Sequence, residues 1–294
     1  YMAMMSEREC YIILNPKEIT ADIERVLEEL KKYPDLERIV ISGEEAVTLS
    51  NEESVLVMVD YHKPSMSISQ KVYDVFDKIA VIDHHRRGDE FPDKPLLTYI
   101  ESTASSASEL VAELIQYRST RKTQIPKFIT TSLLAGIYVD TKNFSVRTTG
   151  RTFDIAGYLK NQGADTSLVQ YMLSTDLDSY LMISELVSKS KHYKEDIVIA
   201  VADDKRVYDS VTVAKAADTL LSINGIHAAF VITRQPSKLI GISARSTGKI
   251  NVQVLMEALG GGGHFTNAAT QIKDKSLDEV KKMLIQELNK LERE

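Results

Sequence analysis

Short apolar runs alternate with segments of helical periodicity through the first half of the chain. The runs are typical of buried strands bounded by polar residues, and they cover residues 10–14, 38–41, 55–59 and 79–82. Between and after them, apolar residues recur three or four positions apart, which predicts helices at residues 19–32, 67–76, 105–116 and 126–139. This alternation predicts a mainly parallel sheet with helices on both faces.

The pattern changes in the second half of the chain. Residues 166–193 keep helical periodicity with few breakers, and we interpret them as a connecting helical segment. Beyond it, strands are predicted at residues 197–201, 228–233, 239–244 and near 270–272, and helices at residues 211–221, 251–259 and 277–294. We therefore expect an α/β protein of two domains, a parallel-sheet domain at 1–165 and a smaller mixed-sheet domain at 194–294.

The composition excludes some classes of binding partner but does not indicate a function. A length of 294 residues allows two domains, and a net charge of −6 argues against binding long nucleic acid through a basic surface. It leaves room for a small anion held by a few local Arg and Lys side chains. The single cysteine, Cys10, excludes an intramolecular disulfide and fits a reducing cytoplasm. No apolar run approaches the ~20 residues that a membrane-spanning helix needs.

Polar side chains follow three apolar segments at the point where each one ends. Asp60 follows residues 55–59, Asp83-His84-His85 follows residues 79–82, and Asp140 follows residues 133–139. Ligands bind at the carboxyl ends of strands in open α/β sheets. Carboxylate and imidazole together suit Mn²⁺, Fe²⁺ or Zn²⁺, and a carboxylate that bridges two ions suits phosphodiester hydrolysis. We predict that Asp60, His84 and Asp140 converge; the alternative is that each Asp only caps a helix.

Further residues could bind an anionic ligand. Arg87 could hold a phosphate beside the histidines, and Arg245 could do so at the end of the strand at 239–244. Ser106 could bind an anion at a helix N-terminus or act as an ordinary N-cap. Four consecutive glycines at 260–263 followed by His264 leave room for a ligand against backbone N–H groups. The alternatives are a solvated Arg245 and a plain glycine turn; the order of elements excludes a dinucleotide-binding fingerprint.

Together, Asp83-His84-His85-Arg86-Arg87, the segments at 59–64 and 136–141, and the glycine loop resemble the DHH phosphoesterase superfamily. They are most similar to its GdpP-type cyclic-di-AMP phosphodiesterases. The resemblance implies a DHH catalytic domain followed by a DHH-associated domain, and hydrolysis of cyclic di-AMP to pApA at a Mn²⁺ pair in bacterial second-messenger turnover. By position, Asp60 resembles the bridging metal ligand and His84 and Asp140 resemble terminal ligands. His85 resembles a catalytic group that contacts phosphate, whereas Arg87, Ser106, Arg245, Gly261, Gly262, Gly263 and His264 would bind the nucleotide.

One part of the family pattern is not found in the sequence. The family supplies further ligands from a His followed by Asp-x-Asp, and neither precedes Asp60 here. We therefore expect a fragment of a longer protein whose catalytic portion lies in the cytoplasm and whose parent is anchored in the membrane. We expect this fragment to turn over its substrate slowly and to form a homodimer. The alternatives are a catalytically impaired nucleotide-binding fragment, or a relative that degrades oligoribonucleotides or dephosphorylates 3′-phosphoadenosine 5′-phosphate.

Overall fold

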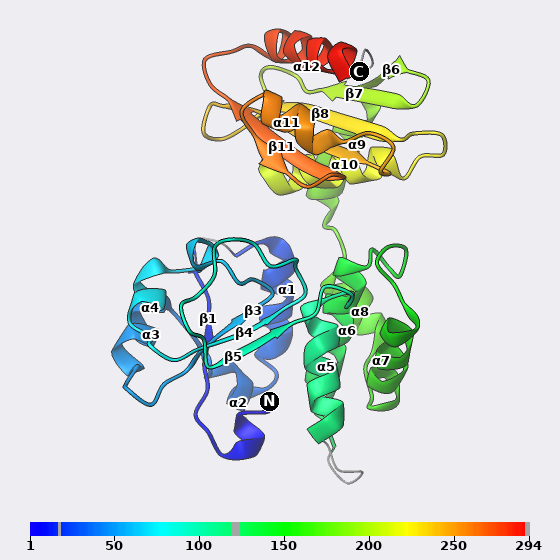
Figure 1. Ribbon diagram of the computed structural model, residues 1–294. Helices are drawn as coiled ribbons and strands as arrows, with labels where there is room; N and C mark the ends of the chain where they lie inside the picture. Colours follow the sequence, from blue (N-terminus) through cyan, green and yellow to red (C-terminus); the bar gives the residue numbers. More distant parts are fainter. Residues whose placement is uncertain (17–18, 119–123, 292–294) are drawn as a thin grey trace. The chain divides into compact units, whose positions relative to one another are not determined.

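The chain divides after Ser174 into two units, Tyr1–Ser174 and Thr175–Glu294 (Figure 1). The computed structural model describes residues 1–16, 19–118 and 124–291. Each unit has its own sheet and its own apolar clusters. The predicted α/β class, with a parallel-sheet domain followed by a mixed-sheet domain, is confirmed.

The strands of the first unit are all parallel to their neighbours. The central sheet has the order β3-β4-β5 and contains β3 (Leu56–Val59), β4 (Ile79–Asp83) and β5 (Leu97–Ile100). A separate pair joins β1 (Ile12–Ile13) to β2 (Val40–Ile41). Because β3 and β4 are parallel and in register from Leu56 opposite Ile79 to Val59 opposite Ile82, both strands end at the same edge. The residues that follow them are therefore neighbours in space.

Helices cover this sheet and extend the first unit. They are α1 (Ala21–Leu30), α2 (Pro34–Glu37), α3 (Gly43–Leu49), α4 (Gln70–Asp74), α5 (Ala107–Arg118), α6 (Lys127–Asp140), α7 (Gly150–Asn161) and α8 (Thr166–Met172), with short 3-10 turns at Met4–Ser6 and Pro64–Met66. In Figure 1, α3 and α4 lie on one side of the three strands and α5 to α8 on the other. Met58 and Val81, both fully buried, pack in one cluster with Ala46 of α3 and Val72 of α4.

The second unit is a six-stranded mixed sheet of order β10-β11-β9-β8-β7-β6. Only its β7–β8 pair is parallel among the described strands. Its elements are α9 (Leu177–Ser188), β6 (Ser190–Lys194), β7 (Ile197–Val201), α10 (Ser210–Leu221), β8 (Ala228–Arg234), β9 (Ile240–Ser246), α11 (Val252–Ala258), β10 (Gly262–Gly263), β11 (Asn267–Ile272) and α12 (Leu277–Leu291).

Alternation along β8 divides the core of this unit between two faces. Phe230 joins the cluster that holds α11 and α12, whereas Ala229 and Val231 join the cluster that holds α9 and α10. This is the period of two that a strand buried on both faces requires.

The structure corrects several expected elements. Residues 166–193 do not form one connecting helix, because α8 ends at Met172 in the first unit and α9 begins at Leu177 in the second. Asp165 and Asp176 each cap their own helix, which explains the break. The strands β5 and β6 were not predicted, and β1 is shorter than the expected strand at 10–14. The end of the helix expected at 277–294 lies outside the described residues.

Within the described residues, no helix combines the length and the apolar character needed to cross a membrane.

Candidate active site

The site forms where β3, β4 and α6 end. Asp60 follows β3, His84 and His85 follow β4, and Asp140 is the last residue of α6. The His84 Nε2 atom lies 3.2 Å from Asp60 Oδ1 and 3.7 Å from Asp140 Oδ2. The structure thus brings together the three side chains expected to converge. Asp60 is half exposed and has a left-handed backbone (φ 70°), a conformation that Asp adopts more readily than most residues.

His84 is oriented by a backbone carbonyl. Its Nδ1 atom lies 3.4 Å from the Ala104 carbonyl oxygen, which can only accept, so Nδ1 carries a proton. Burial lowers the pKa of His84, but the hydrogen bond with Asp60 and the charge of Asp140 outweigh it and raise that pKa. The Nε2 atom faces the two carboxylates, which is the arrangement of a histidine that binds a metal through Nε2.

Two carboxylates that approach the same imidazole nitrogen suit a shared cation. The pKa of Asp140 is raised, first by burial and then by the charge of Asp60. Asp140 also ends α6, where the negative end of the helix dipole disfavours a carboxylate. A divalent cation would offset the repulsion of Asp140 by Asp60 and by the end of the helix dipole. Carboxylate oxygens with an imidazole nitrogen form a donor set that suits Mn²⁺, Fe²⁺ or Zn²⁺. The residues present therefore fit a metal site.

Asp83 holds the histidines rather than facing the carboxylates. Its fully buried carboxylate accepts from His62 Nδ1 at 2.6 Å, from His85 Nδ1 at 2.7 Å, and from the backbone N–H groups of His84 and His85. Burial raises the pKa of Asp83, but these hydrogen bonds outweigh it and the pKa is lowered. His62 accepts from the Gly88 N–H at Nε2, so its proton is on Nδ1. The sequence did not point to this role of His62, which depends on pairing between β3 and β4.

His85 lies beside the same point with its second nitrogen available. Atoms offered by Asp60, His84 and His85 lie within 4.8 Å of one another, a compact group that could hold a metal ion. Asp140 is outside this group, although it lies close to His84. Because Asp83 accepts a hydrogen bond from His85 Nδ1, the Nε2 atom of His85 keeps a lone pair for a metal or for a proton shared with substrate.

Two of the expected substrate contacts in this unit have internal partners. The guanidinium carbon of Arg87 lies 4.1 Å from the centre of the Phe91 ring, a cation–π contact. Arg87 is exposed, so its nitrogens can still meet solvent or substrate. Ser106 is buried, and its hydroxyl accepts from the Glu109 N–H in the first turn of α5. The structure therefore supports the capping alternative for Ser106, because a buried hydroxyl cannot reach a ligand without movement.

The expected nucleotide-binding residues of the second unit lie on neighbouring strands. Arg245 on β9 is paired with Asn267 on β11, and β11 is paired with the glycines of β10. The Arg245 Nε lies 3.2 Å from Asp218 Oδ1 of α10, and Nη1 donates to the Ala244 carbonyl. His264 is exposed, and its N–H donates to the Asn267 carbonyl at 2.7 Å.

The glycines of this loop differ in whether neighbouring atoms leave room for a side chain. A Cβ at Gly261 would lie 2.2 Å from the Ala269 carbonyl oxygen, and one at Gly263 would lie 2.5 Å from Asn267 and Ala268 backbone atoms. Gly263 also has a φ of +147°. A Cβ at Gly262 would meet nothing within 4 Å. Close backbone approach explains Gly261 and Gly263, whereas no neighbouring atom within 4 Å requires glycine at Gly262.

Comparison with known proteins defines the class. A family model described as "DHH family, N-terminal domain" matches residues 3–137, and the "DHHA1 domain" model matches residues 182–290. The chain belongs to the DHH family and carries a DHH domain followed by a DHHA1 domain. An exopolyphosphatase-related protein from Bacteroides fragilis shares the fold, with a TM-score of 0.81 and 19% identity over 98% of this chain and 84% of that one.

Two curated relatives are similar over nearly the whole chain. The cyclic-di-AMP phosphodiesterase PdeA of Listeria monocytogenes is 46% identical over 284 residues, which are 97% of this chain and 43% of the relative. The cyclic-di-AMP phosphodiesterase GdpP of Bacillus subtilis is 45% identical over 281 residues, which are 95% of this chain and 42% of the relative. The chain thus spans less than half the length of both relatives.

Proposed function

We propose that this protein is a metal-dependent phosphodiesterase that hydrolyses cyclic di-AMP to linear pApA. The observation that carries the proposal is the meeting of Asp60, His84 and Asp140 at one point, within a chain 45–46% identical to cyclic-di-AMP phosphodiesterases. Ends of parallel strands are where such folds place their ligands.

The metal we propose is Mn²⁺, with His84, Asp60 and Asp140 as its protein ligands. Mixed imidazole and carboxylate donors suit this ion. When bound, such a metal lowers the pKa of a coordinated water and stabilises charge on the phosphate. By its position in the family pattern, Asp60 would be the ligand shared with a second ion.

The remaining residues of the site position the substrate and handle protons. Asp83 accepts the Nδ1–H of His85 at 2.7 Å and so fixes the direction of the ring. His85 then presents Nε2, which when protonated would donate to the phosphodiester or to the departing 3′ oxygen. Arg87 and, in the second unit, Arg245 are the cations that we propose for the nucleotide phosphates.

The direct test is hydrolysis of cyclic di-AMP by this chain, followed by separation of the products. We expect Mn²⁺-dependent formation of pApA, loss of activity in the presence of EDTA, and a fall of at least ~100-fold in His84→Gln and Asp140→Asn because each removes a ligand. Glu53→Gln, a change at a well exposed side chain of the same unit, is the control and should keep full activity.

Substrate choice separates this proposal from other phosphoesterase activities. The same enzyme preparation is offered a short oligoribonucleotide and 3′-phosphoadenosine 5′-phosphate at equal concentration. Faster turnover of either substrate than of cyclic di-AMP would contradict the proposal. Binding of pApA without any Mn²⁺-dependent turnover would support the alternative of a nucleotide-binding fragment.

A further inference from the structure

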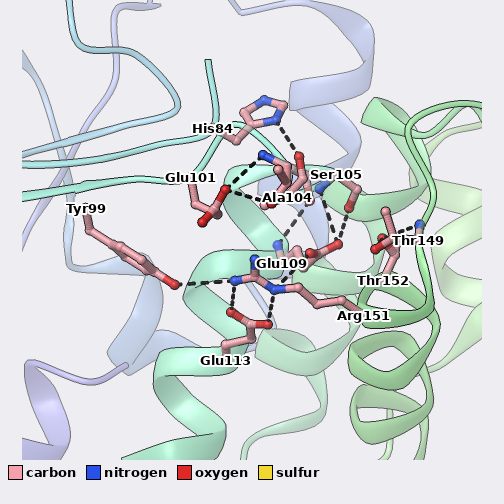
Figure 2. A network of polar contacts seen from close by, with 12 residues as sticks. His84, Tyr99, Glu101, Ala104, Ser105, Glu109, Glu113, Thr149, Arg151 and Thr152 are labelled. Atoms are coloured by element: carbon pink, nitrogen blue, oxygen red, sulfur yellow. Dashed lines mark hydrogen bonds and ion pairs between the residues drawn. The ribbon is translucent and has the colours of Figure 1, made fainter. Parts of the chain in front are cut away.

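The loop between β5 and α5 carries the carbonyl group that orients His84. Figure 2 shows this loop, residues 101–106, lying between His84 and a set of charged side chains on α5 and α7. The Ala104 carbonyl is the acceptor for His84 Nδ1. Thr103 donates to Glu101 through both its N–H and its hydroxyl, which folds the start of the loop.

A buried glutamate holds the other side of the same peptide group. The Ala104 carbonyl and the Ser105 N–H belong to one planar trans peptide, so they point in opposite directions. The Ser105 N–H points at Glu109 Oε2 at 3.4 Å, and the Ser105 hydroxyl donates to that oxygen at 2.5 Å. Fixing the N–H towards Glu109 therefore fixes the carbonyl towards His84. Glu109 is fully buried.

Arg151 of α7 reaches Glu109 from the side away from the loop. Its Nε lies 3.5 Å from Glu109 Oε1, an oxygen with no hydrogen-bond partner. Its guanidinium also forms a two-pronged ion pair with Glu113, one turn further along α5 (Figure 2). The Tyr99 hydroxyl of β5 lies 3.5 Å from the same guanidinium. A buried carboxylate needs such a nearby cation to stay charged.

We propose that Glu109, supported by Arg151, is a positioning residue for His84. Glu109 accepts from the Ser105 N–H, and the shared peptide group then directs the Ala104 carbonyl towards His84. That carbonyl accepts a hydrogen bond from His84 Nδ1, which leaves Nε2 pointing towards Asp60 and Asp140. The inference rests on the proposed function only in taking His84 as a metal ligand. The competing explanation is that Glu109 merely stabilises the start of α5, where its own N–H is capped by Ser106.

The first test observes the imidazole directly, without metal or substrate. Nitrogen-15 NMR of the histidine rings, with His84 assigned by loss of its signal in His84→Gln, reports the tautomer and the exchange of the Nδ1 proton. We expect Glu109→Ala to speed that exchange at least ~10-fold, since the carbonyl is no longer directed towards Nδ1. Glu109→Gln, which keeps a neutral oxygen for Ser105, should recover part of the effect, and Arg151→Lys should have a smaller effect of the same sign.

The second test measures affinity for Mn²⁺ by calorimetric titration. Loss of partners that orient a metal ligand lowers affinity by about tenfold or more, and we expect Glu109→Ala to do so. The matched control is Asp165→Ala, which removes the N-cap of α8 and its ion pair with Lys127 in the same unit. It should lower thermal stability and leave the His84 spectrum unchanged.

These measurements separate the inference from the proposed function. An unchanged His84 spectrum and Mn²⁺ affinity in Glu109→Ala and Arg151→Lys, with only thermal stability lowered, would overturn the positioning role. An altered His84 spectrum in a chain whose His84→Gln variant binds Mn²⁺ normally would retain the positioning role and contradict the metal site.

Discussion

Asp83 shows how one buried carboxylate organises several residues. Both of its oxygens accept from imidazole N–H groups, and backbone N–H groups of His84 and His85 add to them. A buried carboxylate is tolerated only when its hydrogen bonds replace those lost from water. The same bonds fix the His85 ring and the start of the loop after β4.

Replacing Asp83 should therefore cost stability. An amide in Asp83→Asn would present N–H groups to donors, which leaves buried donors without acceptors, and we expect a loss of about 2 kcal/mol in the free energy of unfolding. Urea denaturation followed by circular dichroism measures it. A stability equal to that of the Glu53→Gln control would show that the hydrogen bonds to Asp83 are replaceable.

The glycine loop separates ligand binding from folding at single positions. Gly262→Val adds a side chain where the structure leaves space, so we expect normal thermal stability and at least ~5-fold weaker binding of pApA, because backbone N–H groups become shielded. Gly261→Ala forces a Cβ against the Ala269 carbonyl and should destabilise the second unit instead. Calorimetric titration with pApA and thermal melting of both variants test this. Unchanged affinity in Gly262→Val would leave the loop as a structural turn.

At the scale of elements, the position of Asp140 depends on how α6 packs against α5. A Cβ at Gly136 would lie 2.0 Å from the Ser108 hydroxyl oxygen and 2.9 Å from Ser108 Cβ. Glycine therefore lets the helices approach closely one turn before Asp140. The contact positions the end of α6, and with it one of the proposed metal ligands.

Two glycines in neighbouring helices should respond in opposite ways to alanine. Gly136→Ala should destabilise the protein by about 1–3 kcal/mol, because α5 and α6 must move apart. Gly157→Ala in α7, where a Cβ meets nothing within 4 Å, should instead stabilise it by about 0.5–1 kcal/mol. Urea denaturation of the two variants provides the comparison. A stabilised Gly136→Ala would show that the helices adjust without cost.

The N-cap of α10 should contribute to the acid sensitivity of the second unit. Burial raises the pKa of Asp209, but its hydrogen bonds from the Thr212 hydroxyl and N–H outweigh this and lower it. A lowered folded pKa adds stability that is full above the unfolded value of about 3.9 and is lost as pH falls through the folded value. Asp209→Asn still caps the helix without titrating, so its stability should fall less as the pH decreases below about 4. Acid titrations of the wild type and Asp209→Asn, followed by circular dichroism, measure this loss of stability. An equal dependence of stability on pH in the two proteins would contradict the prediction.

At the scale of the whole molecule, the proposed metal site lies entirely within one unit. All of its candidate ligands come from Tyr1–Ser174, whereas the glycine loop and Arg245 belong to Thr175–Glu294. Metal binding therefore tests the first unit alone, whereas the residues proposed for the nucleotide come from both units. Binding of the metal can therefore be measured by the stability of the first unit.

Adding Mn²⁺ should protect the first unit selectively. A ligand that binds only the folded state stabilises it by about 2.7 kcal/mol at a hundred times its dissociation constant. Hydrogen exchange measured by mass spectrometry should show slower exchange in β3, β4 and α6, with α12 unchanged and the effect absent in His84→Gln. Equal protection of both units would place a metal site in the second unit as well.

The sequence predicted the chemistry of the site better than its geometry. Apolar runs followed by Asp60 and by Asp83-His84-His85 identified strand ends, because strand period and polar termination are local properties. The exact bounds of β1, the unpredicted β5 and the break between α8 and α9 depend on pairing and capping, and helical periodicity alone does not show where a helix stops. Glu109 had a local signal, since Ser106 and Glu109 have the spacing of a capping box, yet its link to His84 required the fold.

What the sequence by itself determined is the α/β class and the family, together with the set of residues proposed here to bind metal and phosphate, because these follow from residue type and spacing. The convergence of Asp60, His84 and Asp140 was predicted from the sequence, but only the tertiary structure showed which residues hold them in place. The parallel register of β3 and β4 brings His62 to Asp83, and the close approach of α5 to α6 at Gly136 positions the end of α6 that carries Asp140. Such contacts join residues far apart in the chain, so they follow from packing in three dimensions and not from any local pattern.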